Sequence, residues 1–425
     1  MIKSSCFMTI HKSMDEINKN HWDHLTNSLD MNYSYEWMQH IVAVYPENLL
    51  IFSIYNQNKK LVAFSCGFNG RDNLPYFYHP KELFFSEQFL RLKPNDHDLD
   101  TQIQLKVKLT DLFNRYKISS DSSISFSSQL NALKVKYTNS FYPTIIFRNG
   151  YTSSIIVDQE LSIEQQNNMK KLMLDYISDY AKENGYKSIT FLYGSKEDHE
   201  IYKEKNYKKT LISGNLQFDT SDFSSFQDYL ITLPSKRRSE VKREIKRFNE
   251  KKIIKKEIDL NNHIEEVSQL ELNNLSKYGN SRSLSKIMRG KAELVSTFGN
   301  NLITFGYYLE DTLVASLVTV TTGDYFNVLS IGIDYEKTEN SFAYLNIVFY
   351  EALQHAIENN IKYVSFGPEA FEVKLRRGAE LVDLYTYIEA INDKEEPFLV
   401  DFLKIFNKSN SIYLNNFHYK FDRKK

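Results

Sequence analysis

The chain has 425 residues, more than one hydrophobic core usually supports, so we expect two domains. Its apolar fraction of 42% and charged fraction of 25% are those of an ordinary globular protein and exclude a disordered one. The formal net charge is −1, so attraction to a polyanion would require a local basic patch.

Cysteine content and hydropathy further limit the kind of protein and the compartment that we expect. Cys6 and Cys66 are too few for a disulfide framework or a four-cysteine zinc site. No apolar run approaches the ~20 residues that span a bilayer, and the N-terminus lacks the apolar core of a signal peptide. These patterns predict a cytoplasmic protein with reduced thiols and no membrane span.

In the first half of the chain, 1–220, the hydrophobic periodicity predicts a mixture of helices and strands. Asn56-Gln57-Asn58 separates two strand-like runs and predicts a hairpin. Between 70 and 141 we expect a helix near 99–116 and an irregular, serine-rich stretch at 119–128. The other expected helices are 15–27, 35–43, 162–184 with Ser162 as its cap and Glu164 close behind, and 197–205; the expected strands are 49–55, 60–68, 144–147, 153–157, 187–193 and 208–218.

The second half, 221–425, follows a polar boundary at 219–225. Ser341 is expected to cap a helix at 342–359. A terminal helix at 395–407 is expected to end in a loose tail. The remaining expected helices are 226–233, 235–249, 262–274 and 284–298, and the expected strands are 253–258, 302–309, 313–320, 325–333 and 384–391.

The segment 361–378, IKYVSFGPEAFEVKLRRG, organises the second half. A short apolar run is expected to form a buried strand that stops at Gly367-Pro368. A polar turn follows and ends at Gly378. We call residues 367–378 the elbow and expect it to contribute to the functional site.

The two halves repeat each other in the same order of elements. SIIVD at 154–158 aligns with SIGID at 330–334, and residues 61–63 align with residues 313–315. In AKENGYKSITF, five residues are identical to their equivalents in AIENNIKYVSF: Ala181, Glu183, Asn184, Lys187 and Phe191. The repeat predicts a duplicated domain, with an insertion in the first copy at about 69–152.

This repeat unit resembles the GNAT acyltransferase fold, and a tandem pair of such units resembles the FemAB-like acyltransferases and the Fem-type aminoacyl transferases. Residues 22–68, 226–248 and 371–380 are similar to family segments. The resemblance implies two tandem GNAT-like α/β (α+β) domains, each a mixed, mostly antiparallel sheet with flanking helices.

The resemblance also implies where a donor binds. In GNAT proteins the N-terminus of the central helix receives the pyrophosphate of an acyl-CoA, which corresponds to Ser341 and Phe342 here. The segments EKTENSFA (336–343) and DQELS (158–162) lack the glycines of that loop. A carrier-borne acyl group or an aminoacyl-tRNA is therefore favoured over acetyl-CoA. No tightly bound cofactor is expected; acyl-CoA, acyl carrier protein or aminoacyl-tRNA would be a co-substrate.

The elbow supplies the expected catalytic residues. Lys374 matches the family lysine that handles the ester end of the donor, although Val373 stands where those enzymes usually carry an aromatic residue. Glu369 and Glu372 could accept the proton of an attacking amine, or could simply favour a helix start. Tyr385 is the expected general acid, and the alternative is that Tyr385 and Tyr387 pack in a core.

The region 235–257 carries eleven Lys or Arg residues against four Glu. One reading is a solvated helix with internal ion pairs, such as Glu240 with Arg243 and Glu244 with Arg247. The other is a docking strip for tRNA, an acidic carrier or a phosphorylated cofactor. On the second reading, Arg237 and Arg238, with Arg376 and Arg377 of the elbow, bind the donor.

Other chemistries have little support in the sequence. His21 and His24 have a short metal-like spacing, but they are only two histidines on an expected helix with no cysteine nearby in the chain, so no metal site is expected. There is no nucleophile-elbow, Walker or dinucleotide motif.

The expected function is transfer of an acyl or aminoacyl group from a thioester or ester to the amine of a small molecule or peptide. The alternative is a catalytically inactive tandem-GNAT module that docks a polyanionic or carrier partner through 235–257. The sequence makes no prediction of oligomeric state.

Overall fold

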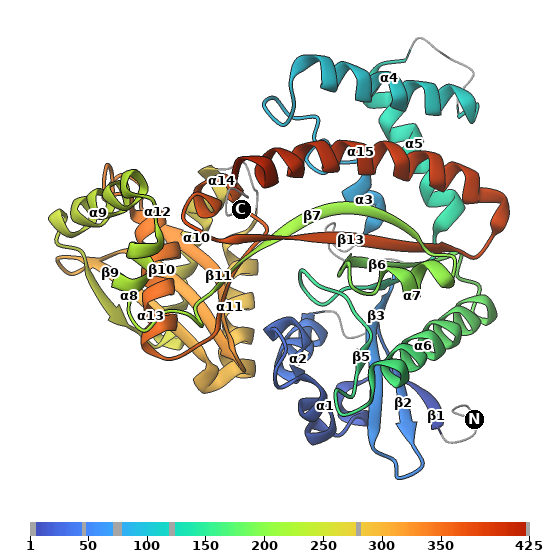
Figure 1. Ribbon diagram of the computed structural model, residues 1–425, viewed down its shortest axis with the longest axis horizontal. Helices are drawn as coiled ribbons and strands as arrows, with labels where there is room; N and C mark the ends of the chain where they lie inside the picture. The colour runs from blue at the N-terminus through green and yellow to red at the C-terminus, as the bar shows by residue number, and fades with distance from the viewer. Residues whose placement is uncertain (1–5, 45–47, 71–78, 119–123, 278–281, 422–425) are drawn as a thin grey trace. The chain divides into compact units, whose positions relative to one another are not determined.

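The computed structural model describes residues 6–44, 48–70, 79–118, 124–277 and 282–421 (Figure 1). It contains two compact units. The first unit takes Met1–Leu25, Val44–Gly214 and Asp383–Lys425, and the second takes Thr26–Ala43 and Asn215–Val382. The division of the chain at 220/221 stays a prediction; the compact units each draw on both sides of it.

The first unit is a mixed sheet with helices packed on it. The hairpin of β2 (Leu49–Asn56) and β3 (Leu61–Asn69) confirms the predicted turn, and α6 (Ile163–Glu183) packs against both strands. The sheet order is β1-β2-β3-β4-β6-β13, with β5 paired to β3. The other strands are β1 (Cys6–His11), β4 (Thr144–Phe147), β5 (Ile156–Val157), β6 (Ser188–Gly194) and β13 (Glu380–Ala390), while β7 (Lys208–Asp219) runs on into the second unit.

A capping box begins α6. Ser162 accepts a bond from the backbone of Gln165, and the Gln165 side chain accepts one from the backbone of Ser162. The cap is as predicted, but its partner is Gln165 at the third helical position rather than Glu164. The short helices α1 (Lys19–Thr26) and α7 (His199–Glu204) complete this part of the unit.

The predicted insertion contains more than added helices. It forms α3 (Pro80–Phe84), α4 (Leu99–Arg115) and α5 (Phe126–Phe141), but also β4, which lies in the sheet between β3 and β6. Residues 71–78 and 119–123 of this stretch lie outside the described residues.

The expectation of a loose tail after residue 407 is wrong. Helix α15 runs from Glu396 to Phe421, and α4 packs against it. Phe398, Phe402, Phe406 and Leu414 are buried at helical spacing, so packing continues the helix beyond the predicted end.

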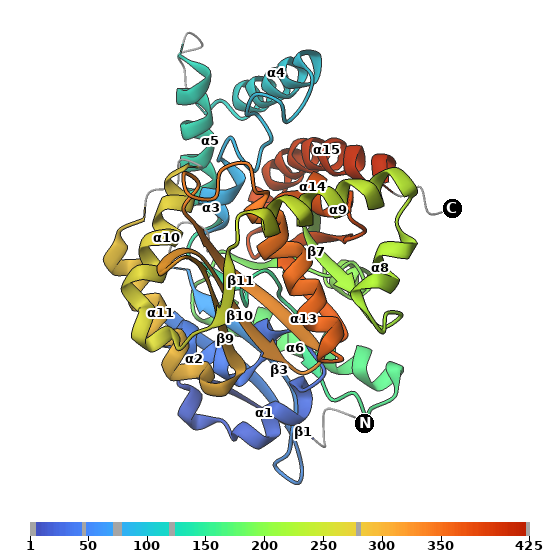
Figure 2. The same cartoon turned by 90° about the vertical axis from the view of Figure 1, so that its left-hand side faces the viewer.

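The second unit repeats this plan with the order β7-β12-β11-β10-β9-β8. Helices α10 (Ile264–Lys277) and α11 (Leu284–Phe298) lie side by side (Figure 2) and cover a core that includes Val318, Val320 and Phe298. The strands are β8 (Ile254–Glu257), β9 (Leu302–Leu309), β10 (Thr312–Thr322), β11 (Tyr325–Ile333) and β12 (Tyr363–Gly367); the other helices are α2 (Tyr35–Val44), α8 (Phe226–Thr232), α9 (Ser235–Glu250) and α14 (Phe371–Leu375).

Strand pairing confirms the predicted duplication. Ala63 pairs with Val157 in the first unit, and the aligned residues Ala315 and Ile333 pair in the second. The Asp158 amide donates to Val62 O at 2.9 Å, and the aligned Asp334 amide donates to Val314 O at 2.8 Å. Single strand β11 of the second unit thus corresponds to β4 and β5 together in the first.

The helix predicted at 342–359 is composite. It consists of α12 (Ala343–Leu345), a π-helical segment η8 (Asn346–Glu351) and α13 (Ala352–Glu358). Ser341 does not cap it, because its hydroxyl donates to Thr338 O at 2.6 Å. The residue preceding the helix is Phe342, in a left-handed conformation with φ +57°. None of the described helices is both long enough and apolar enough to cross a membrane.

Candidate functional site

Lys374 lies inside the elbow rather than on its surface. Its side chain extends from α14, and the residue is only 2% exposed. The amine donates to Phe366 O at 3.2 Å and to Glu369 O at 3.1 Å, so it joins the end of β12 to the turn before α14. Burial lowers the pKa of Lys374 to about 8, although Glu369 acts in the opposite direction. An ammonium has three N–H donors, so one is left for another acceptor.

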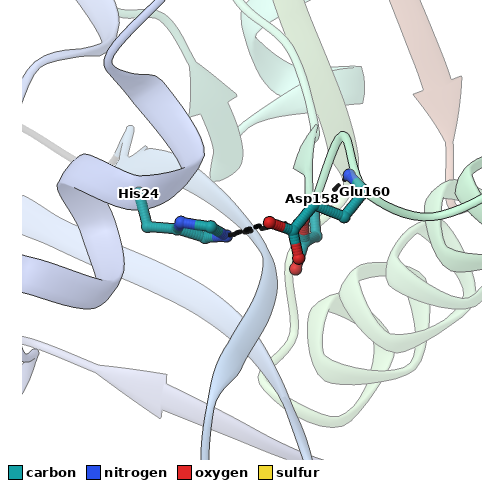
Figure 3. A group of neighbouring side chains, drawn as sticks. All are labelled: His24, Asp158 and Glu160. Atoms are coloured by element: carbon teal, nitrogen blue, oxygen red, sulfur yellow. Dashed lines mark hydrogen bonds and ion pairs between the residues drawn. The ribbon is translucent and has the colours of Figure 1, made fainter.

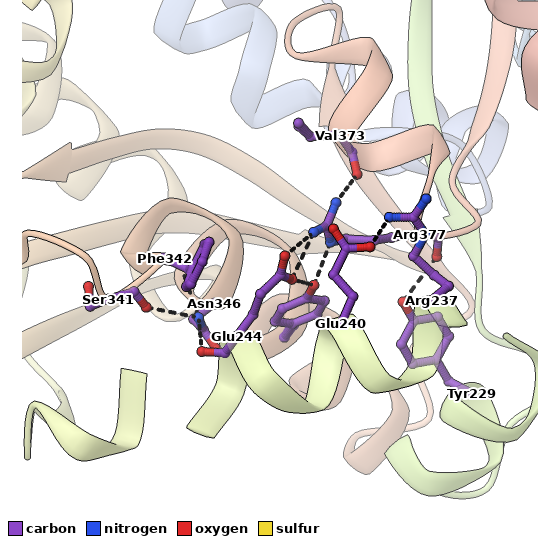
Figure 4. Close-up of polar contacts among 10 residues, drawn as sticks. Tyr229, Arg237, Glu240, Glu244, Ser341, Phe342, Asn346, Val373 and Arg377 are labelled. Carbon is purple, nitrogen blue, oxygen red and sulfur yellow. Dashed lines mark hydrogen bonds and ion pairs between the residues drawn. The ribbon is translucent and has the colours of Figure 1, made fainter. Parts of the chain in front are cut away.

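The other charged residues of the elbow have different environments. Glu369 is exposed, and Glu372 forms an ion pair with Arg376 one helical turn later. Arg377 is 3% exposed and donates to Glu244 at 2.6 and 2.7 Å, to the Tyr350 hydroxyl and to Val373 O at 2.7 Å (Figure 4). The structure therefore places Arg377, a predicted donor-binding residue, in a buried ion pair.

Glu244 belongs to the basic helix α9, and its role differs from the predicted one. The solvated-helix reading paired Glu244 with Arg247 along the helix, but Glu244 is buried and pairs with Arg377, while Tyr350 of η8 also donates to it. The signal was present in the sequence: Val241, Glu244 and Phe248 fall on one helical face, and all three are buried. A carboxylate on an apolar face requires a partner.

Asn346 ties the start of the composite helix to α9. Its amide donates to Phe342 O at 3.0 Å and to Glu244 O at 3.3 Å (Figure 4). Asn346 is buried in the π-helical segment, and sequence reasoning did not single it out. Together with Glu244 and Arg377, it joins three elements at one place: α9, the start of the composite helix, and the elbow.

A pocket of about 440 Å³ opens over the start of the composite helix. The exposed side chain of Phe342 lines this pocket, and Val373 of the elbow forms part of its wall. Of the predicted donor-binding residues, Phe342 lines the pocket, whereas the Ser341 hydroxyl is turned back to Thr338. The lining residues are Lys277, Tyr335, Thr338, Glu339, Asn340, Phe342, Ala343, Tyr344, Leu345 and Val373.

The basic strip is partly occupied by its own contacts. Arg237 forms an ion pair with Glu240, and Arg238 donates to Ile231 O and Leu233 O, both at 3.0 Å. Lys242 and Arg243 are exposed and form no ion pair within the described part of the chain. The same holds for Lys236, so these three residues, rather than Arg237 and Arg238, present positive charge without an ion pair on α9 in the described part of the chain.

Tyr385 lies in the first unit, on β13. Its hydroxyl donates to Asp383 at 3.3 Å, and burial, with a further contribution from Asp383, raises the pKa of Tyr385 to about 12. The hydroxyl is therefore protonated at neutral pH. Tyr387, two residues on, is fully buried and donates to Ser195 O at 2.7 Å, as the core-packing alternative predicts.

Comparisons with known proteins agree on the family and the fold. Residues 112–421 match a FemAB-like family model described as peptidoglycan biosynthesis/recognition. A crystal structure of FemX aligns with TM-score 0.56 and 8% identity over 93% of this chain and all of that one.

Two further structures align less closely. A tandem GNAT protein from the clavulanic acid biosynthesis pathway aligns with TM-score 0.45 and 10% identity, over 91% of this chain and 99% of that one. An L-PGS from Bacillus licheniformis aligns with TM-score 0.42 and 11% identity, over 62% and 83%. No curated protein matches the chain. The family match extends over most of the chain, and with it the chain belongs to the FemAB-like family, with a tandem GNAT-type fold.

Proposed function

We propose that the protein transfers an aminoacyl group from the ester of an aminoacyl-tRNA to the amine of a peptidoglycan-type peptide. Family and fold support the coarser statement, an acyl or aminoacyl transferase. The observation that carries the proposal is the pocket at the start of the composite helix, bordered by the elbow. A helix start offers unpaired backbone N–H groups, which favour the negatively charged part of a donor.

The choice of donor rests on what surrounds that pocket. The segment before the helix has no glycine, so its backbone cannot approach a pyrophosphate as closely as a glycine loop would. Helix α9 is held against the helix start by Asn346 and exposes Lys242 and Arg243. An exposed basic helix beside the pocket suits the phosphate backbone of a nucleic acid, which binds several cations at once.

In the proposed reaction the amine attacks the ester carbonyl carbon, a C–N bond forms, and the C–O bond to the ribose breaks. The amine loses a proton and the ribose oxygen gains one. Lys374 does not line the pocket and is 2% exposed. Its proposed role is to set the position of the elbow beside the pocket, because its amine joins the carbonyls of Phe366 and Glu369. Glu369 is the proposed proton acceptor, since it is exposed on the same elbow.

The experiment compares donors directly. The protein is incubated with aminoacyl-tRNA, acyl-CoA or acylated carrier protein and a peptidoglycan stem peptide, and mass spectrometry follows the consumed donor and the new amide. We expect turnover with aminoacyl-tRNA. Turnover of acyl-CoA or acylated carrier protein alone would overturn the donor assignment. Stable binding of a partner without turnover of any donor would favour the inactive binding module.

A matched pair of variants tests the pocket. Val373→Glu should place a negative charge at the pocket wall, repel the anionic part of the donor and lower turnover at least 10-fold, equivalent to about 1.4 kcal/mol. Val382→Glu, at an exposed valine of the same unit, should leave turnover unchanged. Circular dichroism confirms that both variants fold. Full activity of the folded Val373→Glu variant would remove the pocket from the mechanism.

A further inference from the structure

A cluster of charged side chains in the first unit lies outside the proposed donor pocket. His24 comes from α1, while Asp158 and Glu160 come from the turn between β5 and α6 (Figure 3). His24 Nε2 lies 3.7 Å from Asp158 Oδ1 and 3.8 Å from Glu160 Oε1. One potential ligand atom from each residue lies within 4.8 Å of the others. Three residues of metal-ligating type thus converge from two separate parts of the chain.

Lys60, at the start of the β3 arm of the hairpin, places its amine among these three side chains. The Lys60 amine lies 3.1 Å from His24 Nε2, 3.3 Å from Asp158 Oδ2 and 3.7 Å from Glu160 Oε2. An ammonium only donates hydrogen bonds, so His24 Nε2 must be the acceptor, and its lone pair faces the cluster. That is the state of imidazole that binds a metal ion. The three side chains thus already surround one cation, the Lys60 ammonium.

Backbone bonds hold the turn that carries both residues and fix the Asp158 carboxylate, while the Glu160 side chain is 72% exposed. The Asp158 amide donates to Val62 O, and Asp158 Oδ1 accepts from the Glu160 amide at 3.0 Å. The aligned residue of the second unit, Asp334, makes the same bond to the amide of Glu336, the equivalent of Glu160, and also accepts from the Lys337 amide. The Asp334 carboxylate forms an ion pair with Lys337, whereas Asp158 lies beside a histidine, so the histidine contact is where the two copies differ.

We propose that His24, Asp158 and Glu160 form a site for a divalent metal ion of the zinc type, at which the Lys60 amine competes with the ion. One imidazole nitrogen and two carboxylate oxygens are ligands that Zn²⁺ accepts, with water in the fourth position. With ligand bonds of about 2.0–2.2 Å, two ligands of a tetrahedral ion lie about 3.3–3.6 Å apart. The two distances from His24 are slightly longer than this, and the two carboxylate oxygens, within 4.8 Å of each other, would close around the ion as it binds.

The net charge of the cluster also favours replacement of the Lys60 ammonium by a divalent ion. The two carboxylates and the ammonium sum to one negative charge; a divalent ion in place of the ammonium leaves the site neutral. The Lys60 side chain is 35% exposed and can turn into solvent when an ion enters. The bound ion would join α1 to the turn before α6, and so stabilise the first unit. This inference does not depend on the proposed transferase activity.

Isothermal titration of the 425-residue, tag-free chain with zinc chloride tests the site, with thermal unfolding as a second readout. We expect one saturable site in the wild type. Lys60→Met should bind Zn²⁺ at least 10-fold more tightly, because the competing amine is gone. His24→Ala should bind at least 10-fold more weakly. His21→Ala, on the same helix but outside the cluster, should match the wild type.

Zinc X-ray absorption of the wild-type complex should show one nitrogen of imidazole type and oxygen neighbours. Thermal unfolding without metal checks that each variant is folded. Unchanged or weaker binding by Lys60→Met would contradict competition between the amine and the ion. Binding that survives in His24→Ala, or none in either the wild type or Lys60→Met, would show that the cluster is an ion-pair network with Lys60 as its permanent cation.

Discussion

Lys374 keeps an amine in the interior of the second unit, bonded to the carbonyls of Phe366 and Glu369. Arg377, three residues later, is equally buried, but it is paired with the carboxylate of Glu244. Burial therefore affects these two basic residues differently. It lowers the pKa of Lys374, because a charged amine is costly in the interior. Arg377 keeps its charge because the Glu244 carboxylate pairs with it.

The first prediction concerns the stability contributed by Lys374. Its pKa is about 8 in the folded protein against 10.5 ordinarily, so the unfolded chain binds more protons between these values. The wild-type free energy of unfolding should therefore rise from about pH 8 to pH 10.5 relative to Lys374→Met, by at most about 3 kcal/mol. Below pH 8 the full cost of the buried charge remains. Urea unfolding of both proteins at pH 7.5 and 9.5 measures the difference, and parallel curves would contradict it.

The second prediction concerns Glu244. Glu244→Gln leaves the Arg377 charge buried without a carboxylate and should lower the free energy of unfolding by about 3–5 kcal/mol. Glu240→Gln, one turn earlier on α9 and paired with the more exposed Arg237, should cost less than about 1 kcal/mol. In a double-mutant cycle with Arg377→Met, the two effects should be far from additive. Equal costs at Glu244 and Glu240 in urea unfolding would argue against the buried pair.

At the scale of elements, close contacts between helices and strands decide features that helix and strand propensities do not predict. Helix α10 crosses β11 at Gly332, where an added Cβ would lie 2.5 Å from the Leu270 Cβ and 2.8 Å from the Glu271 amide nitrogen. Only a residue without a side chain allows the helix to pack at this distance. The start of the composite helix is another example, because Ser341 turned away from its expected capping role to bond Thr338.

The third prediction tests this packing. Gly332→Ala should lower the free energy of unfolding by about 1–3 kcal/mol, because it forces α10 away from the sheet. Gly290→Ala is the matched control: it lies in α11 with nothing within 4 Å of its added Cβ. Since glycine is a poor helix former, that change should be neutral or stabilise by up to about 1 kcal/mol. Thermal unfolding of both variants measures the contrast, and a stable Gly332→Ala variant would show that the helix can shift.

At the scale of the whole molecule, the first unit is built from the beginning, the middle and the end of the chain. Its last helix, α15, contributes Phe402 and Phe406, which pack with Phe84 of α3. Asn410, one turn further, donates to Phe89 O at 2.9 Å and accepts from the buried Arg91 at 3.0 Å. The tail is thus a structural part of the unit rather than an appendage.

The fourth prediction follows from that packing. Phe402→Ala removes a fully buried ring and should lower the free energy of unfolding by about 3–5 kcal/mol. Tyr419→Ala, on the same helix at 82% exposure, should change it by less than about 0.5 kcal/mol. Urea unfolding of both variants provides the comparison. A small effect at Phe402 would mean that α15 is dispensable for the first unit.

Much of the fold was predictable because periodicity and repetition are local properties of a sequence. The hairpin at 56–58, the cap at Ser162 and the aligned pairs around Ala63 and Ala315 were all read from short patterns, and the structure confirms them. The length of α15 was not predicted, since its continuation depends on burial against α3 and α4. Nor was the sheet position of β4, because a short strand inside an insertion carries little signal of its partners.

The sequence by itself determined the family, the duplicated α/β plan and the elbow as the place to look, because these rest on residue type, spacing and internal similarity. Tertiary structure alone decided which charges are free. It buried Lys374 and Arg377, gave Glu244 a partner far along the chain, and brought His24 to Asp158 and Glu160. The physical reason is that a charge's behaviour depends on solvent exposure and on neighbours in space, and neither is a property of the residue's position in the sequence.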